Sequence, residues 1–232
     1  MKKILLLLLC LSCVLGVRSQ EIRKVVNVEP QLPDVLDILK MMDITLFRFD
    51  LTSLLDEKYT MSIYIDEYED NKKIKRSQSI HLGDNVEALD DKSVENLDKR
   101  LVKEQMPEEK NKLNCIKELS VGVKELNDTS SMFAIMVPGG IKVVRRVQLH
   151  RIAEFKRNFY RTRPFILREM GKDEHLEIPL ILYGSGWYDA EYNVIRFCGE
   201  KKIDPEMTVQ ILTKLPHYYI LGLELRKVKK LN

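Results

Sequence analysis

The clearest pattern along the chain is an alternation of hydrophobic and polar positions between residues 59 and 68. The strongly apolar residues there occupy every second position, namely Met61, Ile63 and Ile65. A period of two places these side chains on one face of an extended chain and predicts a half-buried β-strand. Residues 44–51 also have strand character, and the polar turn at 70–73 predicts a returning strand over 75–82.

A second group of strand patterns lies in the middle of the chain. Apolar residues alternate with small or polar ones over 119–124. The stretch 132–137 is continuously apolar, which is typical of a strand covered on both faces. Pro138-Gly139-Gly140 then supplies the fixed φ and the positive φ that a tight turn needs, so we predict a hairpin whose return strand runs over 141–150.

The C-terminal part adds three predicted strands, over 176–183, 192–198 and 218–228. In the last of them the apolar side chains fall on one face: Tyr219, Leu221, Leu223 and Leu225. Between the first two lies GSG, residues 184–186, whose glycines predict a tight turn.

Helical spacing is confined to short segments. Apolar residues recur at helical intervals over 33–42, which predicts a helix there, and three of them predict a second short helix over 152–159. Residues 204–216 fit either a helix or a strand. The stretch 84–112 is highly charged and has no aromatic residue, so we interpret it as a polar insertion that contains one exposed helix.

About eight or nine strands, few helices and no repeated βα alternation favour a mainly β fold. The expected architecture is an antiparallel β-sandwich, with a jelly-roll-like arrangement as one candidate topology.

The first residues, MKKILLLLLCLSCVLGVRSQ, have the features of a secretory signal peptide. The apolar run from Ile4 to Gly16 is shorter than the roughly 20 residues of a membrane-spanning helix. Small residues before position 20 predict cleavage after Ser19, which leaves 20–232 as a single β-rich domain. Two alternatives are an uncleaved membrane anchor and a lipoprotein acylated at Cys13.

Removing the signal peptide changes the charge and the cysteine content. The chain has 38 basic and 35 acidic residues, and the signal peptide contains three of the basic ones, so the mature chain is neutral. We therefore expect no nucleic-acid partner. Cys115 and Cys198 remain, and an even pair in an exported protein predicts a disulfide, with two buried free thiols as the alternative.

Local sequence motifs give no sign of catalysis. Gly184-Ser185-Gly186 does not match the nucleophile elbow G-x-S-x-G, because the glycines would have to lie at 183 and 187. The histidines are widely separated and have no metal-binding spacing: His81, His150, His175 and His217. We expect no catalytic residue, no metal and no cofactor, while a triad assembled from distant positions is left open.

The segment 142–168 is strongly basic and has interleaved aromatic residues. Its charge predicts either a patch for an anionic partner or ordinary solvated strand faces. Arg145 shares the apolar face of its strand with Val143 and Val147. A cation in that position needs a partner, so we predict a structural ion pair or an opening into a pocket.

The aromatic residues Trp187, Tyr188 and Tyr192 follow the GSG sequence. Aromatic rings on a turn stack on sugars and other apolar ring faces, so these residues, with Arg145, are the candidate ligand-binding residues. The alternative for Trp187 is a core position beneath the turn.

The leucine-rich signal sequence and strand segments such as DITLFRFDL and PHYYILGLEL resemble those of small exported proteins of gut Bacteroidetes. Many of these proteins are domains of unknown function. The resemblance implies a periplasmic or cell-surface location and a role in polysaccharide capture, and it implies no particular site residue.

The preferred hypothesis is a non-enzymatic binding or structural module of the cell envelope, whose partner is a polysaccharide or an envelope protein. No integral membrane segment is expected. Two alternative hypotheses are an exported hydrolase of glycans or peptides, and an assembly subunit that donates or accepts an edge strand.

Overall fold

A computed structural model gives the fold and describes residues 29, 31–89, 112–167 and 173–228. The chain divides into two compact units, residues 1–38 and 39–232. The predicted signal peptide at 1–19, with Cys13, lies outside the described residues, as does the helix predicted within the polar insertion.

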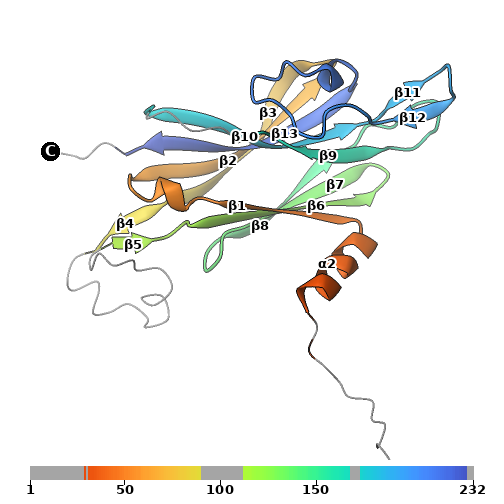
Figure 1. Cartoon of the computed structure of the whole chain (residues 1–232). Coiled ribbons are helices and arrows are strands. Elements are labelled where there is room, and N and C mark those ends of the chain that lie inside the picture. Colours follow the sequence, from red (N-terminus) through yellow and green to blue (C-terminus); the bar gives the residue numbers. More distant parts are fainter. Residues whose placement is uncertain (1–28, 30, 90–111, 168–172, 229–232) are drawn as a thin grey trace, which may run out of the picture. The chain divides into compact units, whose positions relative to one another are not determined.

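The strands of the described residues lie in the second unit, where the long ones form two antiparallel sheets (Figure 1). The four-stranded sheet has the order β1-β6-β7-β8, with β1 at Ile44–Asp50, β6 at Glu118–Asn127, β7 at Ser130–Met136 and β8 at Lys142–Gln148. The five-stranded sheet has the order β3-β2-β13-β10-β9, with β2 at Tyr59–Glu69, β3 at Lys72–Asp84, β9 at Tyr160–Pro164, β10 at His175–Ser185 and β13 at His217–Lys227.

Two short strand pairs complete the described β-structure. β4 (Val86–Ala88) pairs with β5 (Lys112–Asn114), and β11 (Trp187–Asp189) pairs with β12 (Val194–Arg196). The mainly antiparallel β-structure confirms the predicted fold class and is consistent with a β-sandwich.

The main core contains side chains from both large sheets. β2 and β13 contribute the alternating residues that the sequence predicted to be buried, from Met61, Ile63 and Ile65 to Leu221, Leu223 and Leu225. The four-stranded sheet contributes Leu119, Val121, Phe133 and Ile135. Each buried leucine, isoleucine or phenylalanine stabilises the fold by about 1.5–3 kcal/mol, so this apolar layer holds the two sheets together.

A second apolar cluster covers the opposite face of the five-stranded sheet. Tyr64, Leu182 and Ile220 pack there against Ile211 and Leu215, which come from the segment before β13. That segment contains the 3₁₀ helix η2 (Gln210–Thr213), in place of the longer helix or strand considered for 204–216. β13 is therefore buried on both faces over most of its length.

The prediction that 132–137 is covered on both faces is wrong. In β7 buried and half-exposed residues alternate, because one face contacts the core while the other contributes to the outer surface of the four-stranded sheet. Continuous hydrophobicity there reflects residues such as Met132 and Met136, which remain half exposed. The hairpin formed by β7 and β8 is confirmed.

The helix predicted over 33–42 is confirmed as α2 (Leu32–Met41). The helix predicted over 152–159 is wrong, because residues 152–157 form a tight turn closed by a bridge between Ile152 and Arg157. Lys156 has a φ of 52° in this turn, which is incompatible with a continuing right-handed helix. A second 3₁₀ helix, η1 (Thr52–Leu54), follows β1.

The predicted disulfide is also wrong, since Cys115 and Cys198 are both free thiols. Cys115 is half buried against the main core. Cys198 is exposed and follows Phe197, which packs in the second cluster on the other side of the five-stranded sheet. A disulfide needs Cα atoms within about 7 Å, and an intervening sheet keeps these two positions apart.

Candidate ligand-binding pocket

The second unit contains a pocket of about 440 Å³ whose lining comes from four separate parts of the chain. These are residues 69–70, 150–154, 185–188 and 213–217. Strand pairing brings them together, because His217 begins β13 opposite Glu69 at the end of β2. The backbone N–H of Asp70 donates to the carbonyl of Pro216 over 3.0 Å, which fixes the β2–β3 turn beside the start of β13.

The floor of the pocket is built around the buried imidazole of His217. Its Nδ1 lies 2.6 Å from the hydroxyl of Tyr160, and its Nε2 lies 3.2 Å from a carboxylate oxygen of Glu67. The Tyr219 hydroxyl lies 3.2 Å from the same Glu67 oxygen and 2.9 Å from the carbonyl of Gln148. We call the chain Glu67–His217–Tyr160 the His217 relay.

Electrostatics fix the protonation of the His217 relay. Burial, reinforced by the neighbouring His150, lowers the pKa of His217 to about 4, although the hydrogen bond to Glu67 opposes this shift. Burial alone would raise the pKa of Glu67, but hydrogen bonds from His217 and Lys75 hold it below its ordinary value. At neutral pH an ionised Glu67 accepts from Nε2–H, and the Tyr160 hydroxyl donates to Nδ1.

His150 stacks on one face of this imidazole. The two histidine rings stack with centroids 3.8 Å apart and planes 22° apart. The backbone N–H of His150 donates to the Tyr160 hydroxyl over 3.0 Å, while its side chain is 46% exposed. Its Nδ1 lies 4.0 Å from Glu69, so a partly exposed imidazole stands between a buried one and the solvent.

Trp187 and Tyr188 both line the pocket, as the candidate ligand-binding residues would have to. Trp187 is half buried and also packs against the second apolar cluster, so its ring has both core and pocket contacts. Tyr188 meets Phe155 edge to face at 5.7 Å. Tyr192 is 59% exposed and lies outside the lining, with Arg196 over its ring.

The glycines next to these aromatic residues are not turn residues, so the predicted turn at 184–186 is wrong. β10 runs through Gly184 to Ser185, and the chain reverses only after β11. A Cβ atom on Gly186 would lie 2.7 Å from Ile195 and 2.8 Å from the carbonyl oxygen of Arg196. This glycine therefore permits close packing of β12 beneath the pocket.

Ser185 lies at the pocket but does not complete a catalytic triad with His217. It is 2% exposed, and its hydroxyl accepts the backbone N–H of His217 over 3.2 Å. The imidazole Nδ1 instead contacts Tyr160. The His217 relay thus ends on a buried phenol whose pKa is raised by burial, and a phenol of that kind is a poor nucleophile at neutral pH.

Arg145 lies on β8, away from the pocket lining. It shares the half-buried face with Val143 and Val147, as the alternation predicted. Its guanidinium donates to the carbonyl of Val144 over 3.2 Å, and no ion pair with a carboxylate of the described residues is present. The predicted ion pair is therefore not found among the described residues, and a half-exposed arginine can keep its head group hydrated.

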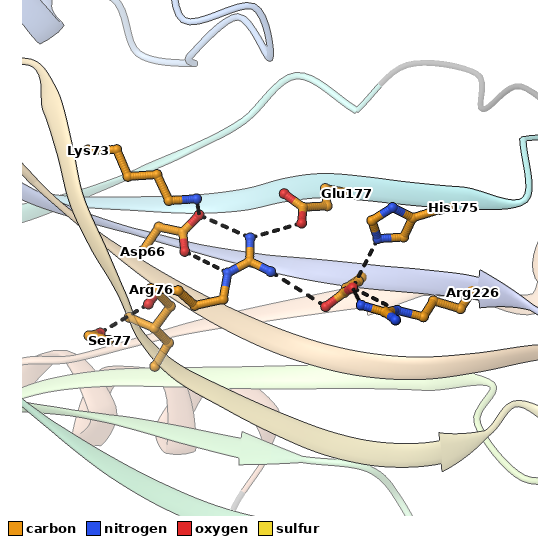
Figure 2. A network of polar contacts seen from close by, with 9 residues as sticks. Asp66, Lys73, Arg76, Ser77, His175, Glu177 and Arg226 are labelled. Atoms are coloured by element: carbon orange, nitrogen blue, oxygen red, sulfur yellow. Dashed lines mark hydrogen bonds and ion pairs between the residues drawn. The ribbon is translucent and has the colours of Figure 1, made fainter.

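A second polar cluster occupies the outer face of the five-stranded sheet (Figure 2). Arg76 bridges three carboxylates, those of Asp66 at 2.8 Å, Glu177 at 2.9 Å and Glu224 at 3.5 Å. Lys73 pairs with Asp66, and Arg226 and His175 both contact Glu224. We call these residues the Arg76 network.

The Arg76 network contains a group of candidate metal ligands, His175, Glu177 and Glu224. Two guanidinium groups already bind these carboxylates, so a metal cation would have to displace arginine side chains. The close pairing also raises the pKa of Arg76 and lowers that of Glu224 despite its burial. We interpret the cluster as a structural ion-pair network.

Sequence patterns did not single out the residues on the pocket floor as a site. His150 and His217 lie far apart in the chain, and neither is part of a motif. Glu67 occupies a position of β2 that faces the main core, where the alternation calls for an apolar residue. This acidic residue was the only local indication of a polar site.

Fold and site together define a β-sandwich-like module with an open, polar and partly aromatic pocket. The chain belongs to the DUF5041 family, a domain of unknown function, whose match covers residues 14–227. No curated protein and no solved structure matches the chain. No helix within the described residues is long and apolar enough to cross a membrane.

Proposed function

We propose that this protein is an exported module of the cell envelope that binds a glycan in the pocket of His150 and Trp187 without catalysing its breakdown. The observation that carries the proposal is the half-buried Trp187 ring at the edge of a polar hollow. An aromatic face beside hydrogen-bonding groups suits a sugar ring, which has an apolar face and a rim of hydroxyls.

The polar lining supports a ligand that is rich in hydroxyl groups. Glu69 and Asp70 supply acceptors, Arg151 and Lys214 supply donors, and both signs of charge face the same hollow. A strongly anionic or strongly cationic ligand would favour a lining with charges of the opposite sign only. The absence of a serine–histidine–carboxylate arrangement around His217 supports binding over acyl transfer.

Tryptophan fluorescence provides the direct test, because Trp187 is the only tryptophan of the chain. Titration with a panel of soluble oligosaccharides and polysaccharides should give a saturable change in emission for at least one of them. Tyr188→Ala should weaken that binding about tenfold or more, as measured by calorimetry. Tyr192→Ala is the matched control, since Tyr192 is an exposed aromatic residue outside the pocket and should leave affinity unchanged.

If no saccharide binds, or if Tyr192→Ala weakens binding as much as Tyr188→Ala, the glycan proposal is wrong. Release of shorter sugars during the titration would instead favour the hydrolase hypothesis. Export is tested separately, by locating the protein in cell fractions and sequencing its N-terminus, which should begin at Gln20 after cleavage of the predicted signal peptide.

A further inference from the structure

We infer that the floor of the pocket is a binding site for a divalent transition metal of the zinc class, with Glu67, His150 and His217 as its protein ligands. The three residues each offer a ligand atom, and these atoms lie within 4.8 Å of one another. Two imidazoles and one carboxylate are a set that zinc accepts, with a fourth position left for water or another ligand. This inference does not depend on the organic ligand of the pocket.

The spacing of the first two ligands already suits a metal. Oε1 of Glu67 and Nε2 of His217 are 3.2 Å apart. Zinc bonds of about 2.0–2.1 Å at tetrahedral angles place two ligand atoms roughly 3.3–3.4 Å apart. An ion bonded to both atoms would lie to one side of the line that joins them, and the separation of the two buried side chains would change little.

His217 and Glu67 also have hydrogen-bond partners of the kind that orient the ligands of a metal site. Tyr160 contacts the other nitrogen of His217 at 2.6 Å, so the imidazole proton can move to Nδ1 and be donated to the Tyr160 oxygen. The Tyr219 hydroxyl contacts the Glu67 oxygen that would bind the metal, while Lys75 contacts the other oxygen at 3.2 Å.

His150 supplies the third ligand after a rotation. In the stacked arrangement the two ring planes are nearly parallel, so their nitrogen lone pairs do not converge on one point. The His150 side chain is 46% exposed, and exposed side chains exchange rotamers readily, so it can turn toward an ion. Metal binding is thus expected to break the stack, and the remaining coordination position faces the pocket.

The Arg76 network serves as an internal comparison, because it also brings a histidine and two carboxylates together. Its carboxylates are bound by Arg76 and Arg226, whereas no arginine contacts Glu67 among the hydrogen bonds and ion pairs of the described residues. A zinc ion should therefore prefer Glu67, His150 and His217 over the candidate ligands of the Arg76 network.

Calorimetry with zinc chloride tests the inference on the protein after removal of any affinity tag, in a Cys198→Ser background that removes the exposed thiol. We expect saturable binding of about one ion per chain. His150→Ala should weaken it at least about tenfold, and Glu67→Gln should do the same. His175→Ala and His81→Ala are matched controls that should bind zinc like the parent protein.

A second readout uses nickel, a paramagnetic ion that quenches nearby tryptophan emission. Trp187 lines the same pocket, so nickel should quench it in the parent protein and far less in His150→Ala. His150 is exposed, so this variant should retain its fold, which circular dichroism verifies. Absence of saturable zinc binding, unchanged affinity in His150→Ala, or loss of binding in His175→Ala would each overturn the inference.

Discussion

Asp66 and Glu67 are neighbours on β2, yet they belong to two very different polar clusters. Asp66 points to the outer face of the five-stranded sheet and joins the Arg76 network, whereas Glu67 points inward and joins the His217 relay. Both clusters are anchored on β2 and β13, because the first contains Glu224 and the second His217. The face of the sheet therefore decides which partners each carboxylate meets.

The two clusters differ in how their charges are neutralised. In the Arg76 network three carboxylates face two arginines and a lysine at short distances (Figure 2). In the His217 relay one carboxylate meets a neutral imidazole, two tyrosine hydroxyls lie nearby, and one side opens into a pocket. Charges that neutralise one another stabilise the sheet, while a carboxylate hydrogen-bonded to a neutral imidazole beside a hollow remains available for a ligand.

The largest effect should follow from breaking the Arg76 network. Arg76→Met leaves Asp66 and Glu224 buried without their shared cation, at 3% and 6% exposure. We expect the free energy of unfolding to fall by about 2 kcal/mol, less than for a fully buried pair because Arg76 is 28% exposed and other cations remain. Urea unfolding measures this change.

The matched control for Arg76→Met is Arg48→Met. Arg48 forms a two-pronged pair with Glu118 on the four-stranded sheet, but its side chain is 67% exposed. We expect no measurable change in unfolding midpoint for this exposed pair. If Arg76→Met and Arg48→Met lower the free energy of unfolding equally, the distinction between a buried network and an exposed ion pair is wrong.

A smaller loss is expected when the His217 relay is cut. Tyr160→Phe removes the hydroxyl that donates to His217 and accepts the backbone N–H of His150. Leaving a buried acceptor and a donor unpaired should lower the free energy of unfolding by about 1–2 kcal/mol. Tyr188→Phe is the control, because its hydroxyl makes an exposed contact with Asn193 and its loss should have little effect.

The smallest effect concerns acid stability and the Arg76 network. The folded protein holds the pKa of Glu224 below its ordinary value of 4.5, so this carboxylate contributes stability that is complete above pH 4.5. The contribution is lost as the pH falls below 4.5 and through the folded pKa, because protonation then removes the charge that Arg226 and Arg76 contact. Urea unfolding should show a shallower acid loss in Glu224→Gln than in the parent protein.

If Glu224→Gln loses stability on acidification as steeply as the parent protein, Glu224 is not the titrating group. A second comparison then applies, since the folded pKa of Asp84 is also lowered by Lys58 and Thr60. Asp84→Asn tests that pair by the same measurement.

The alternation of apolar residues was sufficient to locate β2 and β13, and the turn residues Pro138-Gly139-Gly140 located the β7–β8 hairpin. Each depends on side chains close together in sequence, and a period of two has one structural meaning in an extended chain. The same local pattern was misleading over 152–159, where helical spacing of three apolar residues coincides with a tight turn. Three apolar residues are too few to stabilise a helix, and the positive φ of Lys156 ends any helical turn there.

The pocket could be predicted only in part. Trp187 and Tyr188 stood out by residue type, and they do line it, but Arg145 and Tyr192 lie elsewhere. His150 and His217 were noted only as isolated histidines. Their stacking depends on the turn that follows β8 reaching the first residue of β13.

By itself, the sequence determined the class of fold, since binary patterning is a local property that each strand carries in its own residues. Only the tertiary structure decided that Cys115 and Cys198 stay apart and that Glu67, His150 and His217 meet. The physical reason is that strand order and pairing, rather than spacing along the chain, bring distant side chains within a few ångströms of one another.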